Sequence, residues 1–244
     1  MKSLLLFDVD GTIAHSGKKI ENQMFETLSL LKERFELGIV GGGKLEKVLY
    51  QLDGLEMTHY FTECGCVYHK RIENDLKEMY IKNIREHTLY SKINILIKEV
   101  LLYLSKVDYM LTGNFIDLRN GIIYISLIGM TATEEERRYF IELNKRNEYI
   151  LKLLEILKTK ALEMNILSEL SICRGGEVGI AIYPIEYDKV QVLDSLLGGQ
   201  YDTICYFGDK FDIDGNDYKL IHNENVIGYK VNCVDDTLKI LMDL

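Results

Sequence analysis

The sequence predicts an α/β protein in which an α+β unit with an antiparallel sheet is inserted into a domain built on a parallel sheet. Three observations lead to this prediction. Short apolar runs alternate with helix-like segments near the N-terminus. An Asn-Gly hairpin signal lies in the middle of the chain, and the alternation returns after the only proline, Pro184.

The N-terminal part has the order strand, helix, strand, helix, strand. Its first apolar run, Leu4 to Phe7, is continuous, which is typical of a strand buried on both faces of a parallel sheet. The next segments predict a helix over 20–34, a strand over 35–40, a helix over 44–52 and a strand over 60–63.

The middle of the chain predicts the antiparallel unit. Residues 74–106 are interpreted as a long helical region broken near Tyr90-Ser91. Asn120-Gly121 separates two strand-like runs and is the strongest short signal for a hairpin. Thr133 and Glu136 fit a capping box at the start of a helix. We therefore expect strands over 115–119, 122–126, 166–173 and 178–183, with helices over 133–147 and 149–164.

The α/β pattern resumes after Pro184. Asp188 is placed to cap a helix over 188–197, and the following segments predict strands over 203–207 and 226–231 and a helix over 235–242. The predicted core is thus residues 1–80 and 183–244, and the predicted inserted unit is residues 81–182.

Composition narrows the classes of function. The net charge is −9, so the chain has no general attraction for nucleic acid or for an anionic membrane surface. No apolar stretch approaches the ~20 residues of a membrane-spanning helix, and the first apolar run is too short for a signal peptide. The five cysteines are odd in number and irregularly spaced. They indicate reduced thiols in a cytoplasmic protein rather than a disulfide framework.

The end of the first predicted strand carries Asp8-Val9-Asp10-Gly11-Thr12. Carboxylates two residues apart at a strand end enter one small volume, where they either share a proton or hold a cation. Gly11 and Thr12 then form a tight turn whose backbone N–H groups can face an anion. A plain Asp-Gly turn is the alternative, but this motif fits the context of a buried strand followed by a turn.

Two further strand ends carry polar or glycine-rich sequence. Gly41–Gly43 would let a phosphate approach the backbone, although such a loop is also common as a simple turn. Gly208-Asp209-Lys210 is followed by Gly215-Asn216-Asp217, and acidic residues there can complete a magnesium site or belong to a surface loop. Lys189 would neutralise phosphate charge beside an aspartyl nucleophile. Together these ends favour magnesium-dependent phosphoryl transfer.

These motifs resemble those of a known family. The Asp8–Thr12 motif, the glycine loop, Lys189 and Gly208-Asp209 resemble the four motifs of the haloacid-dehalogenase (HAD) superfamily. Over nearly the whole chain, the order and spacing are similar to those of eukaryotic-type phosphomannomutases, and the strings that carry this likeness are 39–42, 115–121, 135–137, 175–176 and 208–217. The resemblance implies a Rossmann-like HAD core with an inserted α+β cap domain.

The resemblance also implies a reaction. Phosphomannomutases interconvert mannose 6-phosphate and mannose 1-phosphate for GDP-mannose supply, primed by a hexose 1,6-bisphosphate. Asp8 would be the nucleophile that carries the phosphoryl group, and Asp10 the general acid and base. Lys189 would complete the catalytic set. Mg²⁺ would be held by Asp8, the backbone carbonyl of Asp10, and Asp209.

In the cap, Arg119 and Arg137 match phosphate-binding arginines of the family, and they would hold the phosphate of the hexose phosphate that is not reacting. Closure of the cap would exclude the water that hydrolyses an aspartyl phosphate. The family usually forms a homodimer through the cap, and the same is expected here.

Some sugar-binding positions depart from the family. Gly17 and Met130 stand where the family has arginines, and Gly179 and Ala181 stand where it has a serine and an aspartate. A HAD-type sugar phosphatase, or a hexose phosphate mutase of relaxed specificity, is therefore the alternative. A non-catalytic binding module is a third possibility, opposed by four intact residues: Asp8, Asp10, Lys189 and Asp209.

Overall fold

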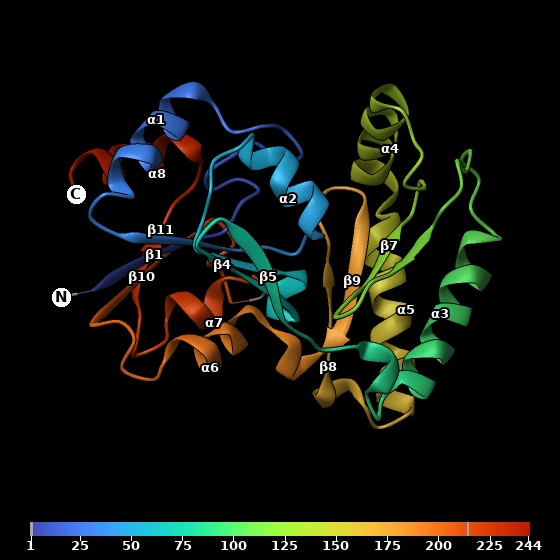
Figure 1. The fold of residues 1–244 in the computed structure, drawn as a ribbon. Helices are drawn as coiled ribbons and strands as arrows, with labels where there is room; N and C mark the ends of the chain where they lie inside the picture. The colour runs from blue at the N-terminus through green and yellow to red at the C-terminus, as the bar shows by residue number, and fades with distance from the viewer. Residues whose placement is uncertain (1, 214) are drawn as a thin grey trace. The chain divides into compact units, whose positions relative to one another are not determined.

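A computed structural model describes residues 2–213 and 215–244. The described chain forms two compact units (Figure 1). The first unit runs up to Lys82 and resumes at Tyr187, and the second unit is Asn83–Glu186. The first contains a seven-stranded, mainly parallel sheet and the second a four-stranded antiparallel sheet. This confirms the predicted fold class.

The sheet of the first unit has the order β11-β10-β1-β2-β3-β4-β5. Its first five members pair in parallel, and β4 and β5 extend it as an antiparallel hairpin. The strands are β1 Ser3–Phe7, β2 Glu36–Val40, β3 His59–Thr62, β4 Val67–Ile72, β5 Asp75–Ile81, β10 Thr203–Gly208 and β11 Ile227–Lys230.

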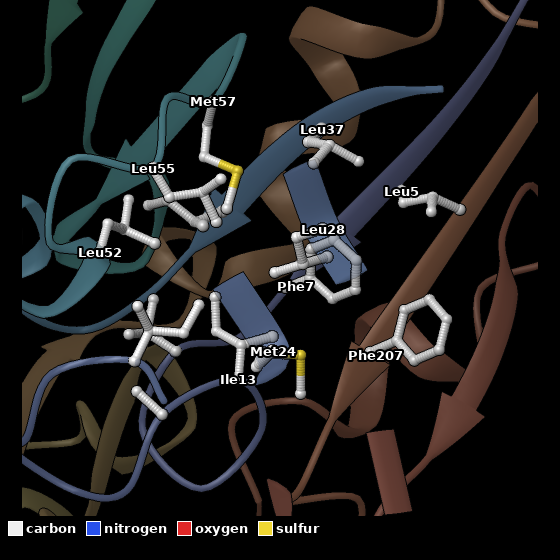
Figure 2. Packing of buried hydrophobic residues seen from close by; sticks show 14 of the residues in the cluster. Leu5, Phe7, Ile13, Met24, Leu28, Leu37, Leu52, Leu55, Met57 and Phe207 are labelled. Atoms are coloured by element: carbon white, nitrogen blue, oxygen red, sulfur yellow. The ribbon is translucent and has the colours of Figure 1, made fainter. Parts of the chain in front are cut away.

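Helices cover both faces of this sheet, which explains the continuous apolar run of β1. Leu5 and Phe7 share a cluster with residues of α1 and α2 (Figure 2) and of α8, whereas Leu4 and Leu6 belong to the opposite cluster, which contains Val192. Because successive side chains of a strand point to opposite faces, every residue of the run is buried. The helices are α1 Asn22–Leu31, α2 Leu45–Leu52, α6 Leu193–Leu196, α7 Tyr218–Ile221 and α8 Val234–Met242.

One sequence-based prediction is wrong in this unit. Residues 75–81 were expected to belong to a long helical region, but they form β5. In addition, the sequence did not predict β4 or α7. The residues of β5 include strong helix formers, yet the segment pairs with β4 through a turn at Glu73, and Tyr80 packs its ring against Tyr68 at 5.5 Å. Cross-strand pairing therefore overrides local helix propensity here.

The sheet of the second unit has the order β6-β7-β9-β8, with every neighbouring pair antiparallel. The Asn120-Gly121 hairpin is confirmed, since β6 and β7 pair across it. The capping box is also confirmed: the Glu136 backbone N–H donates to Thr133 Oγ1 (3.3 Å), and the Thr133 N–H donates to Glu136 Oε2 (2.7 Å). The elements are α3 Tyr90–Leu104, β6 Ile116–Leu118, β7 Ile123–Ser126, α4 Glu134–Asn147, α5 Tyr149–Glu163, β8 Leu170–Arg174 and β9 Gly179–Pro184.

The two faces of this second sheet differ in chemistry. Ile123, Ile125 and Ile182 alternate along β7 and β9 and are fully buried. On the other face, Asp117, Tyr124 and Ala181 are direct cross-strand partners and therefore share one surface. Across the described residues of both units, no helix is both long and apolar enough to cross a membrane.

Candidate active site

Three carboxylates gather at the carboxyl ends of β1 and β10. The Asp8 N–H donates to the Phe207 carbonyl (2.9 Å), which fixes the end of β1 against β10. Asp209 follows β10 directly, and Asp217 lies in the loop beyond it. One carboxylate oxygen from each of Asp8, Asp209 and Asp217 lies within 4.8 Å of the others. The structure thus brings together Asp8 and Asp209 as the sequence predicted.

Glycine is required in the turn of the first motif. Gly11 has a φ of +90°, and a Cβ atom there would lie 2.5 Å from Asp209 Oδ2. The turn closes through a hydrogen bond from the Gly11 N–H to the Ala14 carbonyl (2.8 Å). The Asp-Gly step therefore lets the backbone after β1 approach the carboxylate that follows β10.

Lys189 lies fully inside this carboxylate cluster. Its side chain is 0% exposed, and Nζ donates to Asp8 Oδ1 (2.5 Å) and Asp217 Oδ1 (2.6 Å). Asp217 is buried too, and it accepts hydrogen bonds from the Tyr206 hydroxyl (2.5 Å) and the Lys210 N–H (2.9 Å). The predicted cap is confirmed: Asp188 Oδ1 accepts from the Val190 N–H (3.4 Å) and caps the short 3₁₀ helix Lys189–Val192, which carries the lysine and precedes α6.

The charges of the cluster follow from burial and pairing. The pKa of Asp8 is raised to about 7, chiefly by burial and also by the neighbouring carboxylates Asp217 and Asp209, against the attraction of Lys189. Burial also opposes the charge of Lys189, but Asp217 and Asp8 outweigh it and hold its pKa well above the usual range. Burial would raise the pKa of Asp217 as well, yet Lys189 lowers it. The lysine is a permanent cation at the foot of Asp8.

The donor set fits a divalent cation. Asp209 Oδ1 and Asn216 Oδ1 are buried and accept no hydrogen bond from any residue that the structure describes. Buried oxygens without a donor are costly in a folded protein. Carboxylate and amide oxygens are the ligands that Mg²⁺ prefers. The cluster of Asp8, Asp209 and Asp217 is therefore suited to hold such an ion.

The side chain of Asp10 lies outside the three-carboxylate cluster. Its Oδ1 accepts hydrogen bonds from the Gly17 N–H (2.9 Å) and from Gln51 Nε2 (2.8 Å), and its Oδ2 is paired with Lys47 Nζ. Burial tends to raise the pKa of Asp10, but Lys47 outweighs it and lowers the pKa below its usual value. The two aspartates of one motif therefore have opposite electrostatic surroundings: Asp8 is shifted towards its neutral form and Asp10 towards its ionised form.

The second unit places its two predicted arginines near one tyrosine. Arg119 follows β6, donates from Nε to Asp117 Oδ2 (2.7 Å), and lies over the Tyr124 ring at 5.2 Å. Arg137 is in the first turn of α4. Burial raises the pKa of the Tyr124 hydroxyl, while Arg137 and Arg119 both lower it, so both cations lie within electrostatic reach of that hydroxyl. Two guanidinium groups there can bind an anion.

Tyr124 also explains one departure from the family. A Cβ atom on Gly179 would lie 2.5 Å from the Tyr124 hydroxyl and 2.4 Å from the Ile125 carbonyl oxygen. A Cβ atom on Gly175 would lie 2.8 Å from the same ring. The tyrosine ring thus occupies the space that a side chain at position 179 would need.

Sequence reasoning left four partners of the site without a role. Asp217 was considered only as one of several acidic residues that could complete a magnesium site, in the segment that follows the strand end at Gly208. Lys47 and Gln51 are four residues apart on α2, a spacing that places them on one helix face. Tyr124 lies opposite Asp117 in the register of the predicted hairpin, and counting back from Asn120-Gly121 would have found it.

Comparisons with known proteins agree on a family. The model of the family described as "Eukaryotic phosphomannomutase" matches residues 24–244. The chain is 33% identical over 247 residues to "Phosphomannomutase" of Saccharomyces cerevisiae, covering 100% of this chain and 94% of that protein. It is 34% identical over 242 residues to "Phosphomannomutase 1" of Homo sapiens, covering 97% and 89%.

Solved structures show the fold. An IMP-bound, N-terminally truncated Plasmodium falciparum IMP-nucleotidase superposes with a TM-score of 0.63 at 17% identity, covering 100% of this chain and 68% of that one. The C-terminal domain of the C. albicans trehalose-6-phosphate phosphatase superposes with a TM-score of 0.64 at 14% identity, covering 98% and 91%. At these identities the likeness extends to the HAD fold alone.

Proposed function

The chain belongs to the eukaryotic phosphomannomutase family, and on this premise we propose that it interconverts mannose 6-phosphate and mannose 1-phosphate. The observation that carries the proposal is the buried Lys189 ammonium held between Asp8 and Asp217 at the ends of β1 and β10. A buried cation beside a strand-end carboxylate is suited to phosphoryl transfer, because it offsets the charge of the incoming phosphate.

Asp8 is the proposed nucleophile. Lys189 engages its Oδ1, which leaves Oδ2 to attack the phosphorus of a hexose 1,6-bisphosphate. The bond from phosphorus to the sugar oxygen breaks, and Asp10 donates a proton to that oxygen. A second hexose monophosphate then attacks the aspartyl phosphate while Asp10 removes the proton of its hydroxyl. This restores Asp8 and yields a new bisphosphate.

Magnesium is the proposed cofactor. Asp8, Asp209 and the backbone carbonyl of Asp10 would hold the ion, and the unpartnered Asp209 Oδ1 supports this assignment. When bound, Mg²⁺ neutralises charge on the transferring phosphoryl group. The protein's own part is to keep Asp8 fixed on β1 and Lys189 charged beneath it.

The arginines of the second unit are the proposed binding residues for the other phosphate. Arg119 and Arg137 supply two planar donors beside the Tyr124 hydroxyl. The same surface favours a second candidate function, a HAD-type sugar phosphatase or a hexose phosphate mutase of relaxed specificity. Gly179 and Ala181 bring no hydrogen-bonding side chain to a sugar hydroxyl, and a loosely held sugar leaves room for water as the acceptor.

One assay separates these functions. Mannose 1-phosphate is supplied with Mg²⁺ and a catalytic amount of a hexose 1,6-bisphosphate, and phosphorus is followed by NMR. Formation of mannose 6-phosphate supports the mutase, whereas free mannose with inorganic phosphate supports the phosphatase. Asp8→Asn is the control, because it removes the nucleophile in both. Turnover that persists in this variant would refute the role of Asp8.

The wider proposal is a cytoplasmic homodimer that supplies mannose 1-phosphate for GDP-mannose and protein glycosylation. Exposed leucines on the helices of the second unit support a dimer through that unit: Leu101, Leu102, Leu151 and Leu162. Light scattering should then give twice the chain mass of 28.2 kDa. A mass equal to one chain at micromolar concentration would contradict the dimer.

A further inference from the structure

The carboxylate of Asp10 is held by donors from two separate segments. The Gly17 N–H comes from the loop after β1, and Lys47 Nζ and Gln51 Nε2 come from α2. The two α2 side chains are one helical turn apart, so they reach Asp10 from the same face. Three hydrogen-bond donors therefore hold this partly exposed carboxylate in one orientation.

The two oxygens of Asp10 are held differently. Oδ1 accepts from Gln51, whose side chain is buried, and from a backbone N–H. Gln51 is itself fixed, since its carbonyl accepts the Ile20 N–H (2.7 Å) and its Nε2 also contacts the Lys18 carbonyl (3.3 Å). Oδ2 is paired only with Lys47 among the hydrogen bonds described, and that lysine side chain is 42% exposed. Water can replace Lys47 far more easily than it can replace Gln51.

Resting on the proposed function, we propose that Gln51 and Lys47 are positioning residues for the proton transfer at Asp10, and that Oδ2 is the oxygen that exchanges the proton. Gln51 and Gly17 keep Oδ1 turned toward α2 throughout the reaction. Lys47 holds Oδ2 between transfers and swings into solvent when the sugar oxygen arrives. Oδ2, ionised while it is paired with Lys47, then takes the proton as the O–H bond of the incoming sugar hydroxyl breaks and the Oδ2–H bond forms. In the next transfer the Oδ2–H bond breaks and the proton goes to the leaving sugar oxygen.

The geometry explains why the Asp10 carboxylate must be held by these donors. Asp10 is two residues from Asp8, and Lys189 already pairs with Asp8 and Asp217. An untethered Asp10 carboxylate could turn toward that ammonium or toward a cation held by the cluster. Donors on α2 keep it apart, so that the nucleophile and the acid act on opposite sides of the same bond.

The leaving group offers a selective test. A sugar alkoxide needs a proton as it leaves, whereas the acetate released from acetyl phosphate does not. The wild-type chain, Lys47→Met and Gln51→Met are compared in two reactions: turnover of mannose 1-phosphate, and phosphorylation of Asp8 by acetyl phosphate, read by intact mass after an acid quench. Lys32→Met is the matched control, because Lys32 is a half-exposed lysine of the same unit with only a 3.9 Å contact to Glu56.

We expect both variants to lose at least about tenfold in kcat for mannose 1-phosphate, with KM and the acetyl phosphate rate within about threefold of wild type. Lys47→Arg should recover part of the loss because it keeps a cationic donor. Lys32→Met should match wild type in both reactions. Equal losses in the two reactions, or an unchanged kcat for mannose 1-phosphate, would overturn the proposal.

The wild-type arm tests the proposed function separately. If wild type releases mannose and inorganic phosphate rather than mannose 6-phosphate, the mutase proposal fails. The positioning proposal is then tested by comparing the hydrolysis rates of wild type and the variants, because the same sugar oxygen leaves in that reaction. If wild type does neither while Asp8 still accepts a phosphoryl group from acetyl phosphate, the hexose phosphate substrate is wrong and the positioning proposal falls with it.

Discussion

The two units hold their candidate functional residues in place by different interactions. In the first, a lysine and two aspartates are buried together, and each is bonded to the others or to the backbone. In the second, the arginine of the candidate binding surface lies over a tyrosine ring and donates to a neighbouring aspartate. The first arrangement depends on buried charge and the second on packing of an aromatic ring, so they should fail under different changes.

The largest expected effect is on the buried charges. Lys189→Met leaves Asp8 and Asp217 buried without their cation, and breaking a buried ion pair costs about 3–5 kcal/mol of unfolding free energy. Urea unfolding followed by circular dichroism measures this loss. Lys239→Met, whose exposed lysine is 4.0 Å from Asp236, should change stability by no more than about 0.5 kcal/mol. If Lys189→Met is as stable as this control, the first unit does not depend on its buried charges.

The next effect is a pH dependence confined to the first unit. His59 is fully buried, with Nδ1 2.8 Å from the Tyr68 hydroxyl and Nε2 2.5 Å from the Tyr201 hydroxyl. Because Tyr201 donates its proton to Glu36, Nε2 donates to Tyr201, and in the neutral ring Nδ1 accepts from the Tyr68 hydroxyl. The pKa of His59 is lowered to about 4, chiefly by burial and also by Lys70, against the opposing attraction of Glu36.

The sign follows from that depressed pKa. The unfolded chain takes up a proton at His59 near pH 6.5, and the folded chain does not until about pH 4. This contribution to stability is therefore complete above pH 6.5 and is lost as the pH falls toward 4. At ~1.4 kcal/mol for each pKa unit, the loss is on the order of 3 kcal/mol. The raised pKa of Asp8 acts in the opposite direction over this range, but it is common to wild type and His59→Gln. As the pH falls from 6.5 towards 4, the urea midpoint of wild type should therefore drop relative to that of His59→Gln; equal slopes would contradict the assignment.

A smaller effect should appear on the packed surface of the second unit. Gly179→Ser introduces a Cβ atom into the space of the Tyr124 hydroxyl and the Ile125 carbonyl, and overpacking of this kind costs about 1–3 kcal/mol. Thermal unfolding of the variant measures it. Gly198→Ser is the matched control, since a Cβ there meets nothing within 4 Å. A serine at 179 that is tolerated as well as one at 198 would show that Tyr124 does not fill this space in solution.

The smallest effect concerns the helix that carries Arg137. Thr133→Ala removes the hydroxyl that accepts from Glu136, and losing such an N-cap costs about 1 kcal/mol. Thr159→Ala within α5 should cause no comparable loss, because alanine favours a helix interior. Differential scanning calorimetry compares the two variants. A loss in Thr159→Ala as large as that in Thr133→Ala would argue against a specific role for the cap.

The sequence was sufficient to predict those structural elements that depend on a few neighbouring residues. The apolar run of β1, the Asn120-Gly121 turn and the Thr133 capping box are local, and all three are confirmed. The strand β5 was missed because its extended conformation depends on pairing with β4, while its own residues favour a helix. Local propensity cannot reveal a partner strand.

The site follows the same rule. Asp8 and Asp209 were found because each follows an apolar strand and belongs to a short motif with a glycine, Gly11 and Gly208. The bond between Lys189 and Asp217 joins residues 28 positions apart, and the bond between Lys47 and Asp10 joins residues 37 apart. Neither contact can be predicted from the spacing of the residues along the sequence. The clash between a side chain at position 179 and Tyr124 depends on strand register, so a departure from the family could be noticed in the sequence but not explained.

The place of β1 in the sheet has a further consequence. This strand is flanked by β10 on one side and β2 on the other, and it is followed by a loop whose residues 15–19 are exposed. A protease that cuts at Lys18 would separate the proposed nucleophile, Asp8, from the rest of the chain covalently, yet two rows of backbone hydrogen bonds would keep β1 in the sheet. The N-terminal segment is thus a natural unit for fragment complementation. A synthetic peptide of that length would be a route for placing an altered aspartate beside Lys189.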